Sequence, residues 1–223
     1  MTALSESCAT SVVLETPPSA NSALGREENP EAPCDEVNEM EKRVRATGTH
    51  LYSRQHREMY DFPLLHWCTG RRVLEVGAGY GYGLSRVAEV AAEVVAIDVL
   101  EKNLKHCASH YALPNVRLEL ADICAWEAPE SSFDVALLID VIEHIGNDVQ
   151  ALRNVHRLLR PRGVLFVSTV WPRLADDGRP FNTCHCREYF PREFHKMICG
   201  VFPHVVLHAC PERNLMAIAQ KRW

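Results

Sequence analysis

The strongest constraint on this chain is a glycine-dense turn between two apolar runs, the second of which ends in an acid. Residues 73–76 read Val-Leu-Glu-Val, and residues 77–83 read Gly-Ala-Gly-Tyr-Gly-Tyr-Gly. The second run, residues 93–97, is followed by Asp98, which lies 21 residues after Gly77. This spacing is typical of a strand–turn–helix–strand unit in a parallel sheet. The end of the second strand then lies beside the turn, where Asp98 can accept hydrogen bonds from both hydroxyls of a ribose.

The pattern of the turn distinguishes between two classes of nucleoside cofactor. A dinucleotide-binding turn has the pattern Gly-x-Gly-x-x-Gly, and Tyr82 stands where the third glycine would be. Glu75 lies two residues before Gly77, where its charge would repel a diphosphate and attract a cationic ligand. The stretch Glu75-x-Gly77-x-Gly79-x-Gly81 resembles motif I of the class I S-adenosylmethionine (SAM)-dependent methyltransferases. Their cofactor carries an ammonium and a sulfonium and has no phosphate.

The resemblance, in particular to type 11 and ubiquinone O-methyltransferase-like members of the family, extends from Gly70 to Gln220. It implies an α/β fold with a Rossmann-like, doubly wound sheet and helices on both faces. The sheet would be mostly parallel with an antiparallel last strand, in the order 3-2-1-4-5-7-6. In the family, the acid after the second strand binds the ribose and an Asp after the third meets the adenine amino group. The cofactor site implied here consists of Glu75, Gly77, Ala78, Gly79, Tyr80, Gly81, Asp98, Val99, Asp122, Ile123 and Asp140.

Apolar runs and turn residues predict the individual elements. Four strands are rich in Val, Ile and Leu without alternation, as expected of central parallel strands covered on both faces. Strands are predicted at residues 72–76, 93–97, 116–120, 135–139 and 164–170, with 201–208 and 214–220 as an antiparallel pair at the sheet edge. Helices are predicted at residues 83–90, 100–110, 148–160 and 191–197, and within residues 41–60.

The charge distribution indicates two regions. Residues 1–45 hold nine acids and four bases, which account for the whole formal charge of −5. Residues 1–40 are acidic and contain several prolines but no aromatic residue, so we expect them to be disordered. Residues 41–223 are expected to form the methyltransferase domain with an N-terminal lid helix. Residues 46–223 carry no net charge, which argues against a nucleic-acid partner.

The sequence predicts a cytoplasmic protein and leaves its oligomeric state open. It has no secretory leader, its N-terminal region is too acidic for a transit peptide, and no apolar run could span a membrane. The nine cysteines show no repeating framework and are expected to be free thiols in a reducing compartment. Cys184-His185-Cys186 lacks a second ligand pair, so no zinc site is expected there.

Residues after the fourth strand are candidates for catalysis, because ligands in open α/β folds bind beyond the carboxyl ends of the strands. Asp140-Val-Ile-Glu143-His144 is similar to the Glu-x-x-Glu-His stretch of ubiquinone-type O-methyltransferases, which is linked to a divalent metal and to acceptor activation. Asp140 is shorter than Glu, so we expect no resident metal, with Mg²⁺ as the alternative. His144 has the pKa range of a general base, beside the acids Asp140 and Glu143. The alternative is that Asp140 and His144 only cap and orient the loop.

The segment after the fifth strand is expected to form a wall of the acceptor pocket. Residues 182–189 match an Asn-x-x-His-x-x-Glu-Phe/Tyr stretch of similar methyltransferases. The candidate acceptor-binding residues are Tyr52, Trp171, Asn182 and His185. His185 and Glu188 could instead attach the loop to the body by hydrogen bonds. Tyr52 and Tyr60 could reach the cofactor from the predicted lid or could belong to the core.

The predicted activity is an in-line SN2 transfer of a methyl group to a small-molecule acceptor, with oxygen favoured over nitrogen. One alternative is a methyltransferase-like binding protein without catalysis, whose acidic tail captures a partner. A nitrogen methyltransferase acting on a protein and a nicotinamide-dependent oxidoreductase are further alternatives. The Asn/Asp-Pro-Pro-Tyr motif of many amino-group methyltransferases is missing after the fourth strand, which argues against DNA adenine or glutamine as the acceptor.

Overall fold

The computed structural model describes residues 60–61, 64–111, 113–172, 182, 184–210 and 214–223. The predicted acidic tail, the predicted lid helix up to residue 59 and the candidate Tyr52 lie outside the described residues. The division into a tail and a lidded domain therefore stays a prediction. Within the described ranges, no helix has the length and apolar character needed to cross a membrane.

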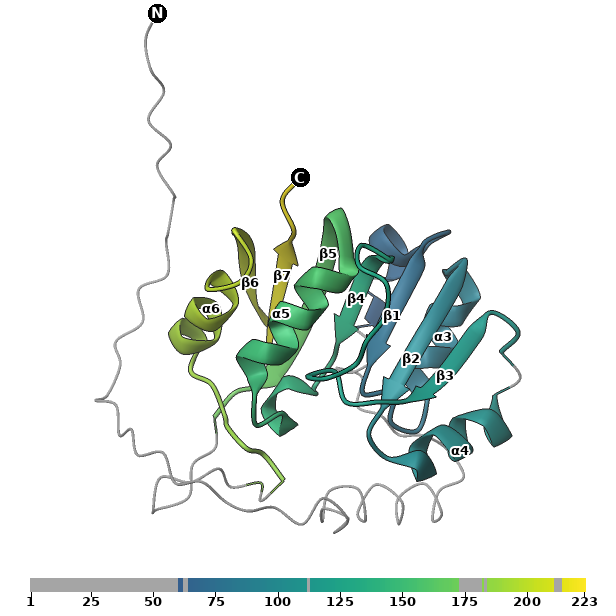
Figure 1. The fold of residues 1–223 in the computed structure, drawn as a ribbon. Helices are drawn as coiled ribbons and strands as arrows, with labels where there is room; N and C mark the ends of the chain where they lie inside the picture. The colour runs from purple at the N-terminus through teal and green to yellow at the C-terminus, as the bar shows by residue number, and fades with distance from the viewer. Residues whose placement is uncertain (1–59, 62–63, 112, 173–181, 183, 211–213) are drawn as a thin grey trace, which may run out of the picture. The chain divides into compact units, whose positions relative to one another are not determined.

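The described ranges form a seven-stranded sheet in the order β3-β2-β1-β4-β5-β7-β6 (Figure 1). Its strands are β1 (Arg72–Val76), β2 (Glu93–Asp98), β3 (Val116–Leu120), β4 (Phe133–Leu138), β5 (Leu159–Val170), β6 (His204–Cys210) and β7 (Asn214–Gln220). Neighbours from β3 to β5 pair in parallel, whereas β7 runs antiparallel to both β5 and β6. The predicted Rossmann-like fold and its strand order are confirmed.

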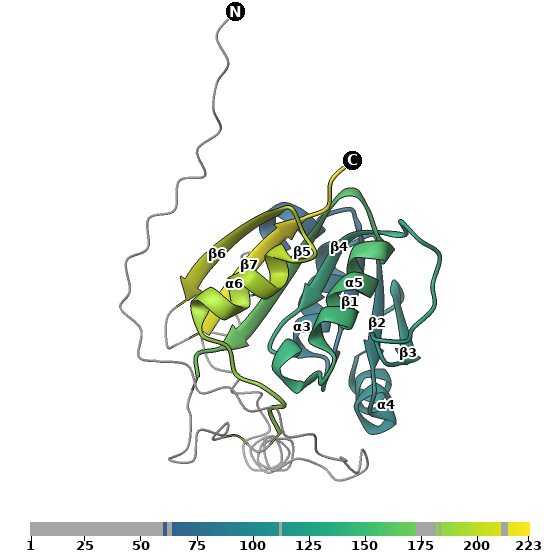
Figure 2. The same cartoon turned by 60° about the vertical axis from the view of Figure 1, so that its left-hand side comes forward.

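Helices cover both faces of the sheet. They are η1 (Leu64–Cys68), α3 (Tyr82–Val90), α4 (Glu101–His110), η2 (Ile142–His144), α5 (Asp148–Leu158) and α6 (Pro191–Cys199). Helices α5 and α6 lie on one face and α3 on the other (Figures 1 and 2). Leu74 packs in the cluster that contains Leu152 and Phe194, whereas its neighbour Val73 packs in the cluster that contains Leu84. Successive strand residues are buried on opposite faces, which explains the unbroken apolar runs of the sequence.

Several element boundaries differ from the predictions, most of them by one or two residues, and β5 begins five residues earlier than predicted. The helix predicted to reach residue 160 ends at Leu158, and β5 begins at Leu159. Arg160 precedes Pro161, and a residue before proline is disfavoured in helical conformation. Strand β6 begins at His204, three residues later than predicted. Residues 201 and 202 instead donate their backbone N–H groups to Ile198 O and complete the end of α6.

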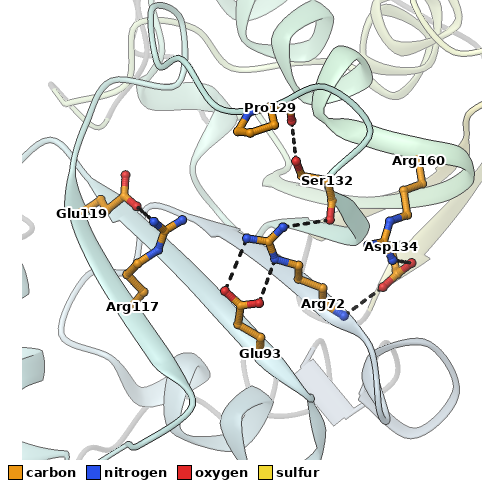
Figure 3. Close-up of polar contacts among 8 residues, drawn as sticks. All are labelled: Arg72, Glu93, Arg117, Glu119, Pro129, Ser132, Asp134 and Arg160. Carbon is orange, nitrogen blue, oxygen red and sulfur yellow. Dashed lines mark hydrogen bonds and ion pairs between the residues drawn. The ribbon is translucent and has the colours of Figure 1, made fainter.

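A network of charged residues joins four strands at the amino edge of the sheet (Figure 3). The Arg72 guanidinium of β1 pairs with Glu93 of β2 at 2.9 Å and donates to Ser132 O at 3.4 Å. The backbone N–H of Arg72 donates to Asp134 of β4, and the same carboxylate pairs with Arg160 of β5. The glycine turn after β1 lies at the opposite, carboxyl edge of the sheet. The network therefore stabilises the strand order and is separated from that turn by the length of β1.

Replacing Arg72 with Met should lower the free energy of unfolding by about 1–2 kcal/mol. The variant loses a half-exposed ion pair and a cation–π contact, since the guanidinium lies 5.0 Å from the Phe133 ring centroid. Urea denaturation would measure the change. Arg117→Met is the matched control, because Arg117 pairs with Glu119 on the edge strand β3 alone. Equal effects of the two substitutions would contradict a joining role for Arg72.

Candidate active site at the carboxyl edge of the sheet

The glycine turn after β1 has a left-handed backbone that admits few other residues. Gly77, Gly79 and Gly81 have φ angles of 72°, 51° and 85°, which side chains disfavour. At Gly77 there is also no room for a side chain, because an added Cβ would lie 2.5 Å from a Val141 methyl carbon. The turn is attached to β2, since the N–H groups of Gly77 and Ala78 donate to Ile97 O at 2.8 and 3.1 Å.

The Asp98 carboxylate, at the end of β2, holds the turn in place. One oxygen accepts from the N–H of Gly79 at 2.8 Å, and the other accepts from the N–H of Leu100 at 2.8 Å. The Asn103 side-chain amide lies 3.1 and 3.2 Å from the two oxygens. The Asn103 Oδ1 atom is buried and makes no hydrogen bond within the described residues. A hydroxyl donor that entered here would find Asp98 and an acceptor on Asn103 side by side.

A second carboxyl group, that of Glu75 in β1, is buried close to the turn. Its Oε1 accepts from the Tyr60 hydroxyl at 3.1 Å, whereas Oε2 has no hydrogen-bond partner in the described part of the chain. Burial raises the pKa of Glu75 to about 8, with the Tyr60 hydrogen bond acting in the opposite direction. The Tyr60 ring lies over Gly83, where an added Cβ would be 1.9 Å from Cζ. Glu75 is therefore a buried acid that a neighbouring cation would ionise.

Exposed apolar side chains lie on the β2/β3 side of the turn. Val99 and Leu120 are 64% and 59% exposed, and Leu120 is the register partner of Asp98 across the strands. Ile123 is buried in the core, and the Asp122 carboxylate accepts from the N–H of Cys124 at 2.8 Å. Val99 and Leu120 are therefore apolar side chains that stay exposed at the carboxyl ends of β2 and β3. Leu120 was not predicted, although it is an apolar residue at the end of an expected strand.

Two of the predicted cofactor residues turn their side chains inward. Ala78 and Tyr80 are 6% and 7% exposed, and the Tyr80 ring packs edge-on against His106 of α4. Because both side chains are buried, a ligand at the turn would contact the backbone groups of Ala78 and Tyr80. Trp171, predicted for the acceptor pocket, packs against the apolar cluster on the α5/α6 face.

After β4, the chain turns sharply and enters η2, which carries Glu143 and His144. The turn begins at Asp140, whose φ angle is 53°. Glu143 is buried, and its carbonyl accepts from the N–H groups of Cys186 and Arg187 at 2.8 and 3.2 Å. His144 Nδ1 lies 3.0 Å from Cys184 O. Because a carbonyl only accepts, the proton of a neutral His144 is placed on Nδ1 and the lone pair on Nε2.

The segment after β5 forms a chain of hydrogen bonds that orients His185. Asn182 Oδ1 accepts from the N–H of Cys184 at 3.0 Å, which directs its amide nitrogen to His185 Nε2 at 3.0 Å. His185 Nδ1 lies 2.9 Å from Glu188 Oε1, and both side chains are almost fully buried. These contacts support the alternative in which His185 and Glu188 attach the loop to the body. The His144 and His185 rings meet edge-on with centroids 4.9 Å apart.

Glu143, His144 and His185 each offer a ligand atom within 4.8 Å of the other two. A carboxylate and two imidazoles are a chemically suitable donor set for a divalent transition metal. His185 fits less well than the other two, because both of its ring nitrogens already contact Asn182 and Glu188. Metal binding would have to displace the Asn182 amide. The expectation of no resident metal stays a prediction.

The raised pKa of Glu75 predicts how stability depends on pH. The folded state holds a proton on Glu75 up to about pH 8, whereas the unfolded state loses it near pH 4.5, the ordinary pKa of a glutamate. The ligand-free protein should therefore lose stability as the pH rises from about 5 to 8. Glu75→Gln removes this loss, so its Tm should exceed that of the wild type by roughly a few degrees at pH 8 and converge with it near pH 5.

Thermal unfolding across that pH range measures the difference. Glu89→Gln, which changes an exposed acid on α3, serves as the matched control and should follow the wild type at every pH. A Tm difference between Glu75→Gln and the wild type that does not change with pH would contradict a buried, protonated Glu75.

Together the fold and the site define a nucleoside-binding α/β domain whose glycine turn is flanked by two fixed acids. A family model described as "Methyltransferase domain" matches residues 74–167. A protein of Mycolicibacterium smegmatis described as "Probable S-adenosylmethionine-dependent methyltransferase" is 35% identical over 151 residues, 67% of this chain and 58% of that protein. A "Ubiquinone biosynthesis O-methyltransferase" of Rhizobium etli is 32% identical over 103 residues, 45% of this chain and 42% of that protein.

Among solved structures, the Burkholderia thailandensis 1,6-didemethyltoxoflavin-N1-methyltransferase superimposes with a TM-score of 0.63 at 20% identity, covering 88% of this chain and 93% of that one. That structure contains S-adenosylhomocysteine (SAH). The domain described here belongs to the class I SAM-dependent methyltransferase family, as the sequence predicts. The chain spans less than two thirds of the length of the curated relatives named above.

Proposed function

We propose that this domain binds SAM at the glycine turn and transfers its methyl group to a small-molecule acceptor. The observation that carries the proposal is the pair of fixed acids, Glu75 on β1, which precedes the turn, and Asp98 on β2, to which the turn is hydrogen-bonded. Two buried oxygens at these acids have no hydrogen-bond partner among the described residues. One is Oε2 of Glu75 itself, and the other is Oδ1 of Asn103, whose amide nitrogen contacts Asp98. A ligand with a cationic group and two vicinal hydroxyls supplies donors for both. The residues present therefore fit SAM.

Most of the predicted cofactor residues have a role in this proposal. Glu75 becomes ionised and neutralises the ammonium, and Asp98 with Asn103 accepts hydrogen bonds from the ribose hydroxyls. Gly79, where an added Cβ would meet no side chain, keeps the path of the cofactor open, whereas Gly77 and Gly81 let the turn pack closely against Val141 and Tyr111. Val99 and Leu120 contact the adenine, with Asp122 and the backbone at Ile123 at its edge. Bound SAM supplies a methyl group that the sulfonium already makes electrophilic, so the protein has to align the acceptor about 3–3.5 Å from it.

His144 is the proposed general base. The Cys184 carbonyl holds the tautomer whose lone pair is on Nε2, which suits removal of a proton from an acceptor hydroxyl. Glu143 lies on the same turn, with a carboxylate oxygen within 4.8 Å of a His144 ring nitrogen. His185, which is oriented by Asn182, packs edge-on against the His144 ring and forms the wall beside it.

Oxygen is the proposed acceptor atom, and a small molecule the proposed acceptor. The sequence similarity to ubiquinone O-methyltransferases over 103 residues supports oxygen. The cytoplasm is the proposed location, supported by the thiols of Cys68, Cys107, Cys124 and Cys184, which form no disulfide among the described residues.

Asp98→Ala should weaken SAH binding by about a hundredfold or more, because two charge-assisted hydrogen bonds to the ribose are lost. Isothermal titration calorimetry with SAH measures the effect, with circular dichroism to verify folding. Asp134→Asn, which changes an acid at the amino edge, should bind as the wild type does. Wild-type protein that is folded but binds a nicotinamide dinucleotide in place of SAH would overturn the proposed function.

His144→Asn tests the base without removing its attachment. The Asn amide can still donate to Cys184 O but has no basic nitrogen, so kcat should fall by about 10²–10⁴-fold while SAH affinity stays within about threefold. Turnover of labelled SAM against phenol and carboxylate acceptors provides the assay. If a chelator abolishes wild-type activity and added Mg²⁺ restores it, a metal rather than His144 activates the acceptor.

A further inference from the structure

Asp140 has a backbone conformation that is uncommon for a residue with a side chain. Its φ angle of 53° lies in the left-handed region, which aspartate tolerates better than most residues but still disfavours. In the described ranges, two other non-glycine residues share this conformation, Ser131 and Arg162. Ser131 lies just before β4, and Arg162 lies in the first residues of β5, so both are at the amino edge of the sheet. Among the described residues, Asp140 is therefore the non-glycine residue with a left-handed backbone at the carboxyl edge of the sheet.

One buried hydroxyl makes two hydrogen bonds to Asp140 that favour this conformation. Ser168 of β5 is completely buried, and its Oγ accepts from the backbone N–H of Asp140 at 2.9 Å. The same hydroxyl donates to Asp140 Oδ1 at 2.6 Å. The two bonds join the backbone and the carboxylate of one residue to one oxygen atom. Rotation of either the Asp140 backbone or its side chain would break one of them.

The direction in which the chain leaves Asp140 determines what lies above the glycine turn. The next residue, Val141, approaches Gly77 so closely that no side chain fits there. Ile142 is fully buried and begins η2, which carries Glu143 and His144. Asp140 therefore sets the position of η2 relative to the turn after β1. A different backbone conformation at Asp140 would separate the two halves of the site.

The geometry points to Ser168 as a positioning residue that holds Asp140 in its left-handed conformation and thereby fixes η2 against the cofactor turn. This inference rests on the proposed function, because it assigns Ser168 a role in binding SAM. Ser168 touches neither cofactor nor acceptor in this account and acts through Asp140. The role depends on a hydroxyl that donates and accepts at once, which alanine lacks and threonine keeps.

Strand β5 provides its own control in Thr169, the next residue. Thr169 is also completely buried, but its hydroxyl makes no hydrogen bond within the described residues. Thr169→Val removes a hydroxyl of the same depth without removing a bond, so it should bind SAH as the wild type does. Ser168→Ala removes both bonds to Asp140.

Calorimetric titration with SAH is the first readout, applied to the wild type, Ser168→Ala, Ser168→Thr and Thr169→Val. We expect Ser168→Ala to raise the Kd about tenfold, and Ser168→Thr and Thr169→Val to remain within about threefold of the wild type. Hydrogen exchange of the ligand-free protein is the second readout. The amides of residues 140–142 should exchange faster in Ser168→Ala, whereas those of β1 and β2 should not change.

Wild-type-like SAH affinity in Ser168→Ala would overturn this inference and leave the proposed function intact. An equal loss of affinity in Thr169→Val would also overturn it, since the effect would then belong to the strand as a whole. Failure of the folded wild type to bind SAH would contradict the proposed function itself, and the role of Ser168 with it. Slower or unchanged exchange at residues 140–142 in Ser168→Ala would show that the hydroxyl does not hold the turn.

Discussion

The contact on which the site depends is the hydrogen bond from the backbone N–H of Gly79 to the carboxylate of Asp98. It joins the turn after β1 to the end of β2, and the same carboxylate caps the start of α4 through Leu100 and Asn103. A negative charge is thereby held where three left-handed glycines leave the backbone open. Without it, neither the path of the turn nor the acceptor for a ribose would be defined.

The two edges of the sheet differ in how their charged groups are paired. At the amino edge, the charges of Arg72, Glu93 and Asp134 are paired with one another and with Arg160 (Figure 3). At the carboxyl edge, buried oxygens of Glu75 and Asn103 have no hydrogen-bond partner in the described part of the chain. Unsatisfied buried oxygens are costly, and they concentrate where a ligand completes the site. The difference between the edges assigns stability to one and ligand binding to the other.

Most of the fold could be predicted from the sequence, because the strands and the glycine turn follow from local patterns and the strand order follows from the resemblance to the methyltransferase family. The end of α5 at Leu158 was not predicted, since the helical spacing of apolar residues continues beyond it. Pro161, which disfavours helix in the residue before it, lies three residues further along the chain. Within the site, the sequence singled out Asp98 but not Asn103, whose buried position only the folded α4 reveals. Ser168 interrupts the apolar run of residues 164–167, a visible signal, but its partner Asp140 is 28 residues away in sequence. Contacts of this kind depend on strand register, which single-sequence patterns do not contain.

The central claim, that the buried acid of the turn receives a ligand cation, can be tested by the proton that binding releases. Calorimetric titration of the wild type with SAH at pH 7, in two buffers of different ionisation enthalpy, measures that proton directly. Because the pKa of Glu75 is about 8 in the ligand-free protein, ionisation by the ligand ammonium should release about one proton per SAH bound. Tight binding without proton release would contradict the role of Glu75, and absence of binding in the folded protein would contradict the cofactor site as a whole.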